Sequence, residues 1–399
     1  MKIVSYLNVS NPNNLLADSG FVLQKLLLET LSNFGHEIVL LAPIEAQKLT
    51  TVKVIPIEVP LTKYHARFDF DWKSVATSTQ GLWNNVDILI VNQVEIAAPL
   101  KALTFIESQR DIPIVSYVHY LPIDSINYEQ ELIYDSSLND VGLGSWILGT
   151  IKTAIECADA CVVESQFAKE LLLTKIGNPK KLKIIHPPIE PELQSLSQVN
   201  PSKDKIKILY NHRLYAHYGT AELFDWIDVA LKGHENDCEV LVTSPRGKRT
   251  QNQCNLDVHS EKVANAICSR PYVKIIEAKS RTEYHKVLET IHLGIAPLRS
   301  APLWNLSIAD VLATGRPVLT SHSGAFPELL EDSSEYVFFD RDEFITKLYK
   351  LIESPPIPSP TLAERICNKF HPTNIAFQWE IFLLETLNEV PVSSKKCIH

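Results

Sequence analysis

Three consecutive residues, Asn305, Leu306 and Ser307, stand where an apolar segment gives way to a predicted helix. The pattern predicts a strand over residues 293–298 and a helix over residues 307–313. The first N–H groups of a helix have no acceptor within it, and after a strand they point to the sheet edge that holds anionic ligands. We therefore predict that these three residues bind an anion.

Two further polar side chains are predicted at strand ends. His119 follows the apolar run 112–118, where an imidazole can hydrogen-bond a ligand hydroxyl, although a purely structural histidine explains it too. Arg246 lies in the cationic turn 244–250, directly after the predicted strand 239–243. A nucleotide base, a phosphate or a polyanion could bind there, and a solvated basic loop explains the turn equally well.

The composition is that of a globular protein with more than one domain. The chain has 399 residues, of which 45% are hydrophobic and 21% charged. Its formal net charge of −9 argues against a surface that is basic throughout, but not against a local basic site. Seven cysteines, an odd number, indicate reduced thiols. No apolar run approaches the roughly 20 residues of a membrane span, so we predict a cytoplasmic protein without a transmembrane segment.

Two motifs near Asp310 resemble a known family. Residues 310–318 (DVLATGRPV) and 321–328 (SHSGAFPE) are similar to the donor segment of retaining GT-B glycosyltransferases of the family-4 type. Residues 158–169 and 211–219 resemble two more segments of that family. The resemblance implies an α/β protein with two Rossmann-like, doubly wound domains that face each other across a cleft. It also implies an enzyme (EC 2.4) that moves a sugar from a nucleoside diphosphate sugar to a hydroxyl acceptor.

The resemblance also assigns roles to single residues. Arg213 would clamp the diphosphate, because the leaving group gains negative charge and a guanidinium can meet two of its oxygens. Asp310 would hold the ribose hydroxyls, and Glu328 would touch the nucleotide or brace its segment. His119 would contact the donor sugar in a front-face transfer, in which the leaving phosphate oxygen takes the acceptor proton.

The chain departs from the family pattern at several places, among them the following three. Pro302 stands where the family has a glutamate that touches the transferred sugar, and Tyr218 where it has a phosphate-binding lysine. A second donor beside Arg213 would then come from His212, His217 or Arg246. The turn after the first strand keeps one glycine of the family's several. Ser19 and Gly20 are therefore assigned to the donor site, with helix capping by Asp18 or Ser19 as the simpler alternative.

The predicted domain organisation follows the resemblance and the loss of hydrophobic periodicity near residue 200. Residues 1–195 form an N-terminal domain on the acceptor side, 196–205 a linker, 206–372 the donor-binding domain and 373–390 a helix that returns to the first domain. In the first domain, Tyr64, Trp72 and Tyr128 lie in long segments that do not fit a bare Rossmann pattern. We predict that they shape the acceptor pocket, and surface loops are the alternative.

The resemblance implies no metal and no cofactor, and a UDP- or GDP-sugar as the donor substrate. The expected acceptor is a glycan, a lipid or a small molecule. A modified base in DNA or tRNA is an alternative, since Lys180, Lys181 and the turn at Arg246 could contact phosphates. The motifs would also fit a sugar-nucleotide epimerase or a non-catalytic sugar-nucleotide-binding protein. Neither the donor sugar nor the acceptor follows from the sequence.

Overall fold

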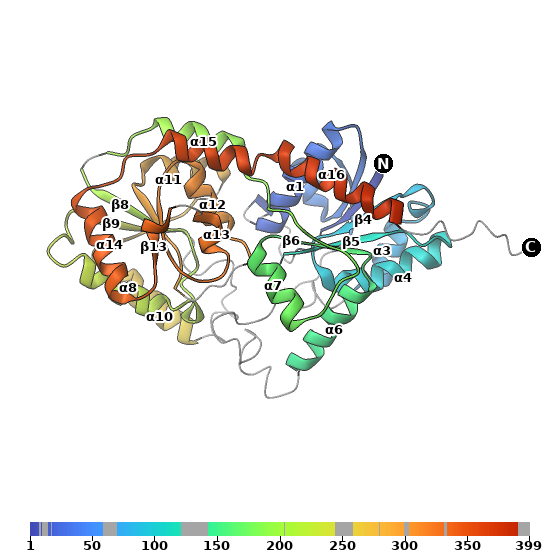
Figure 1. The fold of residues 1–399 in the computed structure, drawn as a ribbon, viewed down its shortest axis with the longest axis horizontal. Helices are drawn as coiled ribbons and strands as arrows, with labels where there is room; N and C mark the ends of the chain where they lie inside the picture. Colours follow the sequence, from blue (N-terminus) through green and yellow to red (C-terminus); the bar gives the residue numbers. More distant parts are fainter. Residues whose placement is uncertain are drawn as a thin grey trace, which may run out of the picture. The chain divides into compact units, whose positions relative to one another are not determined.

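The computed structural model describes residues 1–7, 9, 15–16, 18–58, 70–119, 121, 143–202, 204–243, 258–278, 280–298, 303–330 and 333–389. These residues form two compact units. Unit 1 comprises residues 1–188 and 372–399, and unit 2 comprises residues 189–371. Each unit is built on one parallel sheet with helices on both faces (Figure 1). The predicted pair of doubly wound α/β domains is confirmed.

Unit 1 contains a seven-stranded parallel sheet in the order β3-β2-β1-β4-β5-β6-β7. The strands are β1 (Lys2–Tyr6), β2 (Glu37–Ala42), β3 (Lys53–Pro56), β4 (Ile88–Val91), β5 (Ile114–Val118), β6 (Ala160–Val163) and β7 (Leu182–Ile184). The central strands β4, β5 and β6 are buried along their whole length, as expected for strands covered on both faces.

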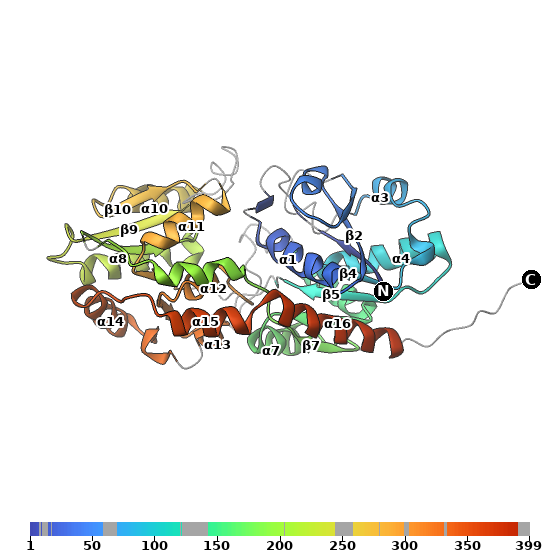
Figure 2. The ribbon, with the colours of Figure 1, turned by 90° about the horizontal axis from the view of Figure 1, so that it is seen from above.

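The helices of unit 1 follow the strands in the chain. They are α1 (Ser19–Asn33), α3 (Trp72–Ser78), α4 (Ala97–Ser108), α6 (Leu143–Cys157), α7 (Gln166–Lys175) and α16 (Pro372–Glu389), with short 3-10 turns η2 (Ile44–Lys48), η3 (Trp83–Asn85) and η4 (Val94–Ile96). Although they lie at opposite ends of the sequence, α1 and α16 are side by side (Figures 1 and 2). Ser165 caps α7 by accepting the Ala168 N–H at 3.0 Å.

Unit 2 contains a six-stranded parallel sheet in the order β10-β9-β8-β11-β12-β13. The strands are β8 (Ile206–Tyr210), β9 (Cys238–Thr243), β10 (Val273–Ile276), β11 (Leu293–Ile295), β12 (Val318–Ser321) and β13 (Val337–Phe338). The helices are α8 (Thr220–Ala230), α10 (Val258–Cys268), α11 (Arg281–Thr290), α12 (Leu306–Ala313), α13 (Phe326–Leu330), α14 (Arg341–Glu353) and α15 (Pro360–Lys369), with η5 (Pro191–Gln198), η6 (Ala216–Tyr218) and η7 (Ser334–Tyr336).

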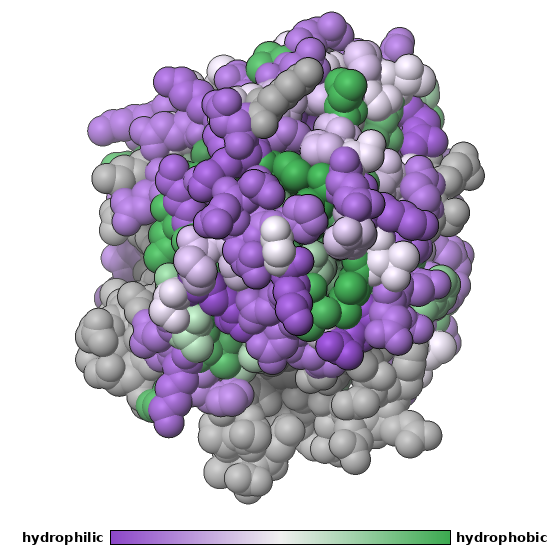
Figure 3. All heavy atoms as spheres, turned by 90° about the vertical axis from the view of Figure 1, so that its left-hand side faces the viewer, coloured by the Kyte–Doolittle hydropathy of each residue, from purple (hydrophilic) through white to green (hydrophobic). Residues whose placement is uncertain are grey.

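Two hydrophobic cores cover the two faces of the unit 2 sheet. Ile208 and Tyr210 of β8 point into the core that α8, α10 and α14 complete, whereas Leu209 points into the core under α11, α12 and α15. This alternation is the two-residue period of a strand. Hydrophilic side chains dominate the face of unit 2 seen in Figure 3, with smaller apolar areas between them.

The chain enters unit 2 earlier than the linker expected at residues 196–205. Leu193 and Leu196 of η5 are buried in the core of unit 2, and the Ile189 N–H bonds the Phe370 carbonyl at 3.0 Å. Leu193 and Leu196 are three residues apart, so they lie on the same face of a 3-10 helix. Burial of both side chains stabilises the packing of this segment against unit 2.

Candidate functional site

The strand order of unit 2 reverses direction between β8 and β11, and the predicted anion-binding residues follow these two strands. Ligands of open α/β sheets bind at the carboxyl ends of the strands at this reversal. The Asn211 side chain donates to the Ser307 carbonyl at 3.0 Å and to the Tyr284 hydroxyl at 2.7 Å. The bond to Ser307 ties the turn after β8, which carries Arg213, to the first turn of α12, and the bond to Tyr284 ties it to α11.

Asn305 itself caps α12. Its side-chain oxygen accepts the N–H of Ile308 at 3.0 Å, so this oxygen is engaged within the helix. The cap fixes where the helix begins, and the backbone N–H groups of Leu306 and Ser307 belong to its open first turn. The Asn305 side chain is therefore used in capping, and anion binding by the N–H groups of Leu306 and Ser307 stays a prediction.

Arg213 is exposed and weakly tethered. Its guanidinium donates to the Tyr215 hydroxyl at 3.3 Å and lies 5.6 Å from the centre of that ring. No carboxylate in the described part of the chain pairs with it. Tyr218, at the family's lysine position, stands against Tyr215 with ring centroids 5.4 Å apart. The cation of Arg213 is thus available to a ligand.

His212 does not add a second positive charge. Burial lowers the pKa of its imidazole to about 3, so the ring is neutral at ordinary pH. The ring packs edge-on against Tyr210 at 5.4 Å. The other two residues expected to help Arg213 are not tested, because Arg246 and the side chain of His217 lie outside the described residues.

Asp310 is buried, with 1% of its surface exposed. One carboxylate oxygen, Oδ2, lies 3.1 Å from Nη1 of Arg281, whereas Oδ1 has no partner among the described residues. Burial raises the pKa of the Asp310 carboxyl, and the positive charge of Arg281 opposes this. A buried acceptor without a donor is costly, so a ligand hydroxyl that reached Oδ1 would be bound favourably.

Arg281 and Glu190 complete this charged group and were not predicted. Two nitrogens of Arg281 bond the Glu190 carboxylate, with the shorter distance at 2.7 Å, and His285 Nε2 lies 2.9 Å from the same carboxylate. Burial alone would raise the pKa of Glu190, but the bonds from His285 and Arg281 lower it to about 2. No sequence signal pairs these residues, because Glu190 precedes η5 while the others lie in α11 and α12.

In unit 1, the strand order reverses between β1 and β4, and Ser19 and Gly20 begin the helix after β1. Asp18 caps this helix by accepting the Phe21 N–H at 3.1 Å, which is the simpler alternative considered for this turn. A side chain at Gly20 would meet Asn92 Nδ2 and Asp18 Oδ1, both at 3.2 Å. The glycine is thus explained by close packing, and the donor role of both residues stays a prediction.

His119 follows β5 and lies between two polar groups. Its Nδ1 is 2.6 Å from Oε1 of Glu164, and its Nε2 is 3.2 Å from the hydroxyl oxygen of Ser19. Glu164 was not predicted, although a single carboxylate at the end of the apolar strand β6 is a signal that could have revealed it.

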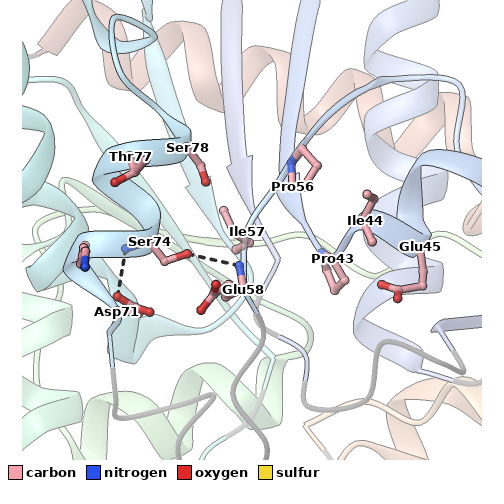
Figure 4. Close-up of a pocket in the computed structure, with 11 residues that line it drawn as sticks. Pro43, Ile44, Glu45, Pro56, Ile57, Glu58, Asp71, Ser74, Thr77 and Ser78 are labelled. Atoms are coloured by element: carbon pink, nitrogen blue, oxygen red, sulfur yellow. Dashed lines mark hydrogen bonds between the residues drawn. The ribbon is translucent and has the colours of Figure 1, made fainter.

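A cavity of about 670 Å³ opens in unit 1 at the carboxyl ends of β2 and β3 (Figure 4). It lies between these strand ends and α3, and the Glu58 N–H donates to the Ser74 hydroxyl oxygen at 3.4 Å. The lining residues are Pro43, Ile44, Glu45, Pro56, Ile57, Glu58, Asp71, Lys73, Ser74, Thr77 and Ser78.

Of the predicted acceptor residues, only Trp72 is described. It begins α3 between two residues that line the cavity, is 44% exposed and packs edge-on against Phe70 at 5.2 Å. Tyr64 and Tyr128 lie outside the described residues. Glu328 is half-buried in α13. Among the described helices, none is long and apolar enough to cross a membrane.

The two doubly wound units and their polar strand ends are the architecture of GT-B glycosyltransferases, and comparison with known proteins bears this out. Residues 25–193 match the model of Glycosyltransferase Family 4. A search of curated proteins by sequence finds no match.

Solved structures share the fold over nearly the whole chain. Sucrose-phosphate synthase from Thermosynechococcus elongatus is 14% identical with a TM-score of 0.72, covering 97% of this chain and 100% of that one. Anabaena HepE in complex with UDP and glucose is 14% identical with a TM-score of 0.68, covering 96% and 99%. Trehalose-6-phosphate synthase OtsA has the same identity and score, covering 98% and 99%. The chain therefore has the GT-B fold, and its residues 25–193 are similar to Glycosyltransferase Family 4.

Proposed function

We propose that the protein transfers a sugar, with retention of configuration, from a UDP- or GDP-sugar to a hydroxyl acceptor. The observation that carries this proposal is the bond from Asn211 to the Ser307 carbonyl, because it ties the Arg213 turn to the start of α12 at the strand reversal of unit 2. The similar HepE structure, which contains UDP, supports a nucleotide at such a site.

The chemistry follows from the charges. Arg213 and the N–H groups of Leu306 and Ser307 stabilise the diphosphate as the glycosidic C–O bond breaks and negative charge builds on the leaving oxygen. Asp310 accepts a ribose hydroxyl at the carboxylate oxygen that has no protein partner among the described residues. Glu328 braces the nucleotide segment. The acceptor oxygen bonds the sugar on the face the diphosphate leaves, and its proton passes to the leaving phosphate oxygen.

The cavity beside Trp72 is our candidate for the acceptor side of unit 1. The cavity lining carries three carboxylates and one cation: Glu45, Glu58, Asp71 and Lys73. This excess of negative charge favours a neutral or positively charged hydroxyl compound over a phosphate-rich one. Lys180 and Lys181, which could have served a nucleic-acid acceptor, are paired with carboxylates. Binding of an oligonucleotide that strengthens as the salt concentration falls would contradict this preference.

Arg213→Ala tests the donor site. We expect kcat to fall about a hundredfold or more, because a preorganised charge contact to the leaving group is lost. The matched control is Lys274→Ala, which removes an exposed cation from β10 of the same unit. Mass spectrometry with a panel of nucleotide sugars and acceptors measures transfer and donor hydrolysis. An Arg213 variant within a few-fold of wild type would show that the clamp is wrong, and epimerised donor without acceptor would favour an epimerase.

A further inference from the structure

Glu164 is buried, with 1% of its side chain exposed, and its carboxylate is held from more than one side. The Tyr117 hydroxyl donates to this carboxylate, while the backbone carbonyl of Glu164 accepts a bond from the His186 ring at 2.8 Å. Burial, followed by the charge of Glu164 and this bond, raises the pKa of Tyr117 well above its ordinary value. The phenol therefore remains a donor, and the carboxylate has a fixed position.

The same carboxylate lies 2.6 Å from Nδ1 of His119. An ionised carboxylate can only accept hydrogen bonds, so the contact requires a proton on Nδ1. When the ring is neutral, its other nitrogen, Nε2, then carries the lone pair. That atom lies 3.2 Å from the hydroxyl oxygen of Ser19, which is exposed at the start of α1.

His119 thus has an inner and an outer nitrogen. The side chain is 20% exposed, the inner nitrogen meets a buried carboxylate, and the outer one lies beside an exposed hydroxyl. The Tyr117 ring stacks on the imidazole with centroids 6.0 Å apart. Rotation of the ring by half a turn would place a carbon against Glu164 and lose the short bond.

We propose that Glu164 is a positioning residue that fixes the tautomer and orientation of His119, so that Nε2 is the atom offered to the substrate. The inference rests on the proposed function in one respect, namely that His119 contacts the substrate. A carboxylate at one ring nitrogen sets which nitrogen carries the proton. At metal sites, losing such a partner of a ligating histidine typically costs about ten- to a hundredfold in metal affinity or activity, and we expect a loss of similar size here.

Nitrogen-15 NMR of the full chain labelled at histidine tests the tautomer without any activity. The chain has 13 histidines, so the His119 signals are assigned by their loss in His119→Asn. At a pH where the ring is neutral, wild type should show a protonated Nδ1 and an unprotonated Nε2. Glu164→Gln should show a mixture, because an amide can accept or donate. Glu170→Gln, on exposed α7 surface, is the control and should match wild type.

A double-mutant cycle tests the effect on catalysis. We expect Glu164→Gln to lower kcat at least tenfold, with the donor KM changed less than threefold, and to have no further effect in a His119→Ala background. Glu164→Leu should lower kcat in the same way. If this variant does not fold, the test rests on Glu164→Gln. An equal loss in both backgrounds, or an unchanged tautomer in Glu164→Gln, would overturn the inference. A chain that transfers no sugar would refute the proposed function, and the NMR result would still decide the role of Glu164.

Discussion

Buried charges in unit 2 are compensated by charges of opposite sign in a group formed by Glu190, Arg281 and Asp310. Arg281 bridges two carboxylates, and each charge that leaves water gains an opposite charge within hydrogen-bonding distance. Glu190 is satisfied by Arg281 and His285, whereas Asp310 keeps one oxygen without a protein partner in the described chain. The group therefore holds Asp310 in place and leaves one acceptor for a ligand.

Glu190→Gln should change how stability depends on pH. The pKa of Glu190 is about 2 in the folded chain against an ordinary 4.5, so ionised Glu190 stabilises the fold above about pH 4.5. This stabilisation is lost as the pH falls from about 4.5 to about 2. The free energy of unfolding of unit 2, measured with urea, should therefore fall less steeply between about pH 4.5 and about pH 2 in the variant than in wild type. Glu192→Gln, at an exposed position of η5, should keep the wild-type slope, and a parallel curve for Glu190→Gln would contradict the argument.

At the scale of elements, the turn between α12 and β12 is fixed by two neighbouring residues. Gly315 has a φ of +74°, and its carbonyl accepts the Ser359 N–H at 2.7 Å. Arg316 is completely buried and donates to the backbone carbonyls of Leu196, Val199, Glu289, Ile291 and Thr314. The turn thus joins α12 to η5 and α15, and this positions the helix that begins at the candidate donor site.

Gly315→Ala should destabilise unit 2 by about 1 to 3 kcal/mol or more, because its φ is strained for alanine. The new Cβ would also lie 2.3 Å from the Ser359 carbonyl oxygen. Gly149→Ala is the control, since a Cβ there meets open space within helix α6. That change should be neutral or stabilise by up to about 1 kcal/mol. Thermal unfolding of both variants measures the difference, and equal melting temperatures would refute it.

At the scale of the molecule, the last helix belongs to the first unit. Trp379 of α16 is 1% exposed in the unit 1 core and packs edge-on against Tyr117 at 5.7 Å. His36 and Glu380 join the same helix to the chain after α1 at 2.8 Å. Because Tyr117 holds Glu164, the end of the sequence supports the surroundings of His119.

Trp379→Ala should destabilise unit 1 by about 3 to 5 kcal/mol, since a large buried ring is replaced by a cavity. Hydrogen exchange measured by mass spectrometry should show faster exchange in β1 and β5 and little change in β8 and β9. Phe377→Ala is the control on the same helix, because its ring is 56% exposed. Equal acceleration in both units, or none, would contradict the assignment of α16 to the unit 1 core.

The sequence could predict the elements and the fold, because these depend on local patterns. Apolar runs predicted the buried strands, and the donor motif predicted the GT-B fold. The boundary of unit 2 could not be placed, because whether Leu193 and Leu196 enter a core depends on the surfaces of distant helices.

By itself, then, the sequence determined that two doubly wound domains form and which residues end their strands. Only the tertiary structure decided what those residues contact. Glu164 meets His119 from another strand, Arg281 divides its charge between Glu190 and Asp310, and burial keeps His212 neutral. The physical reason is that periodicity and capping act within a few residues of the chain, whereas hydrogen bonds and desolvation depend on groups brought together by the sheet.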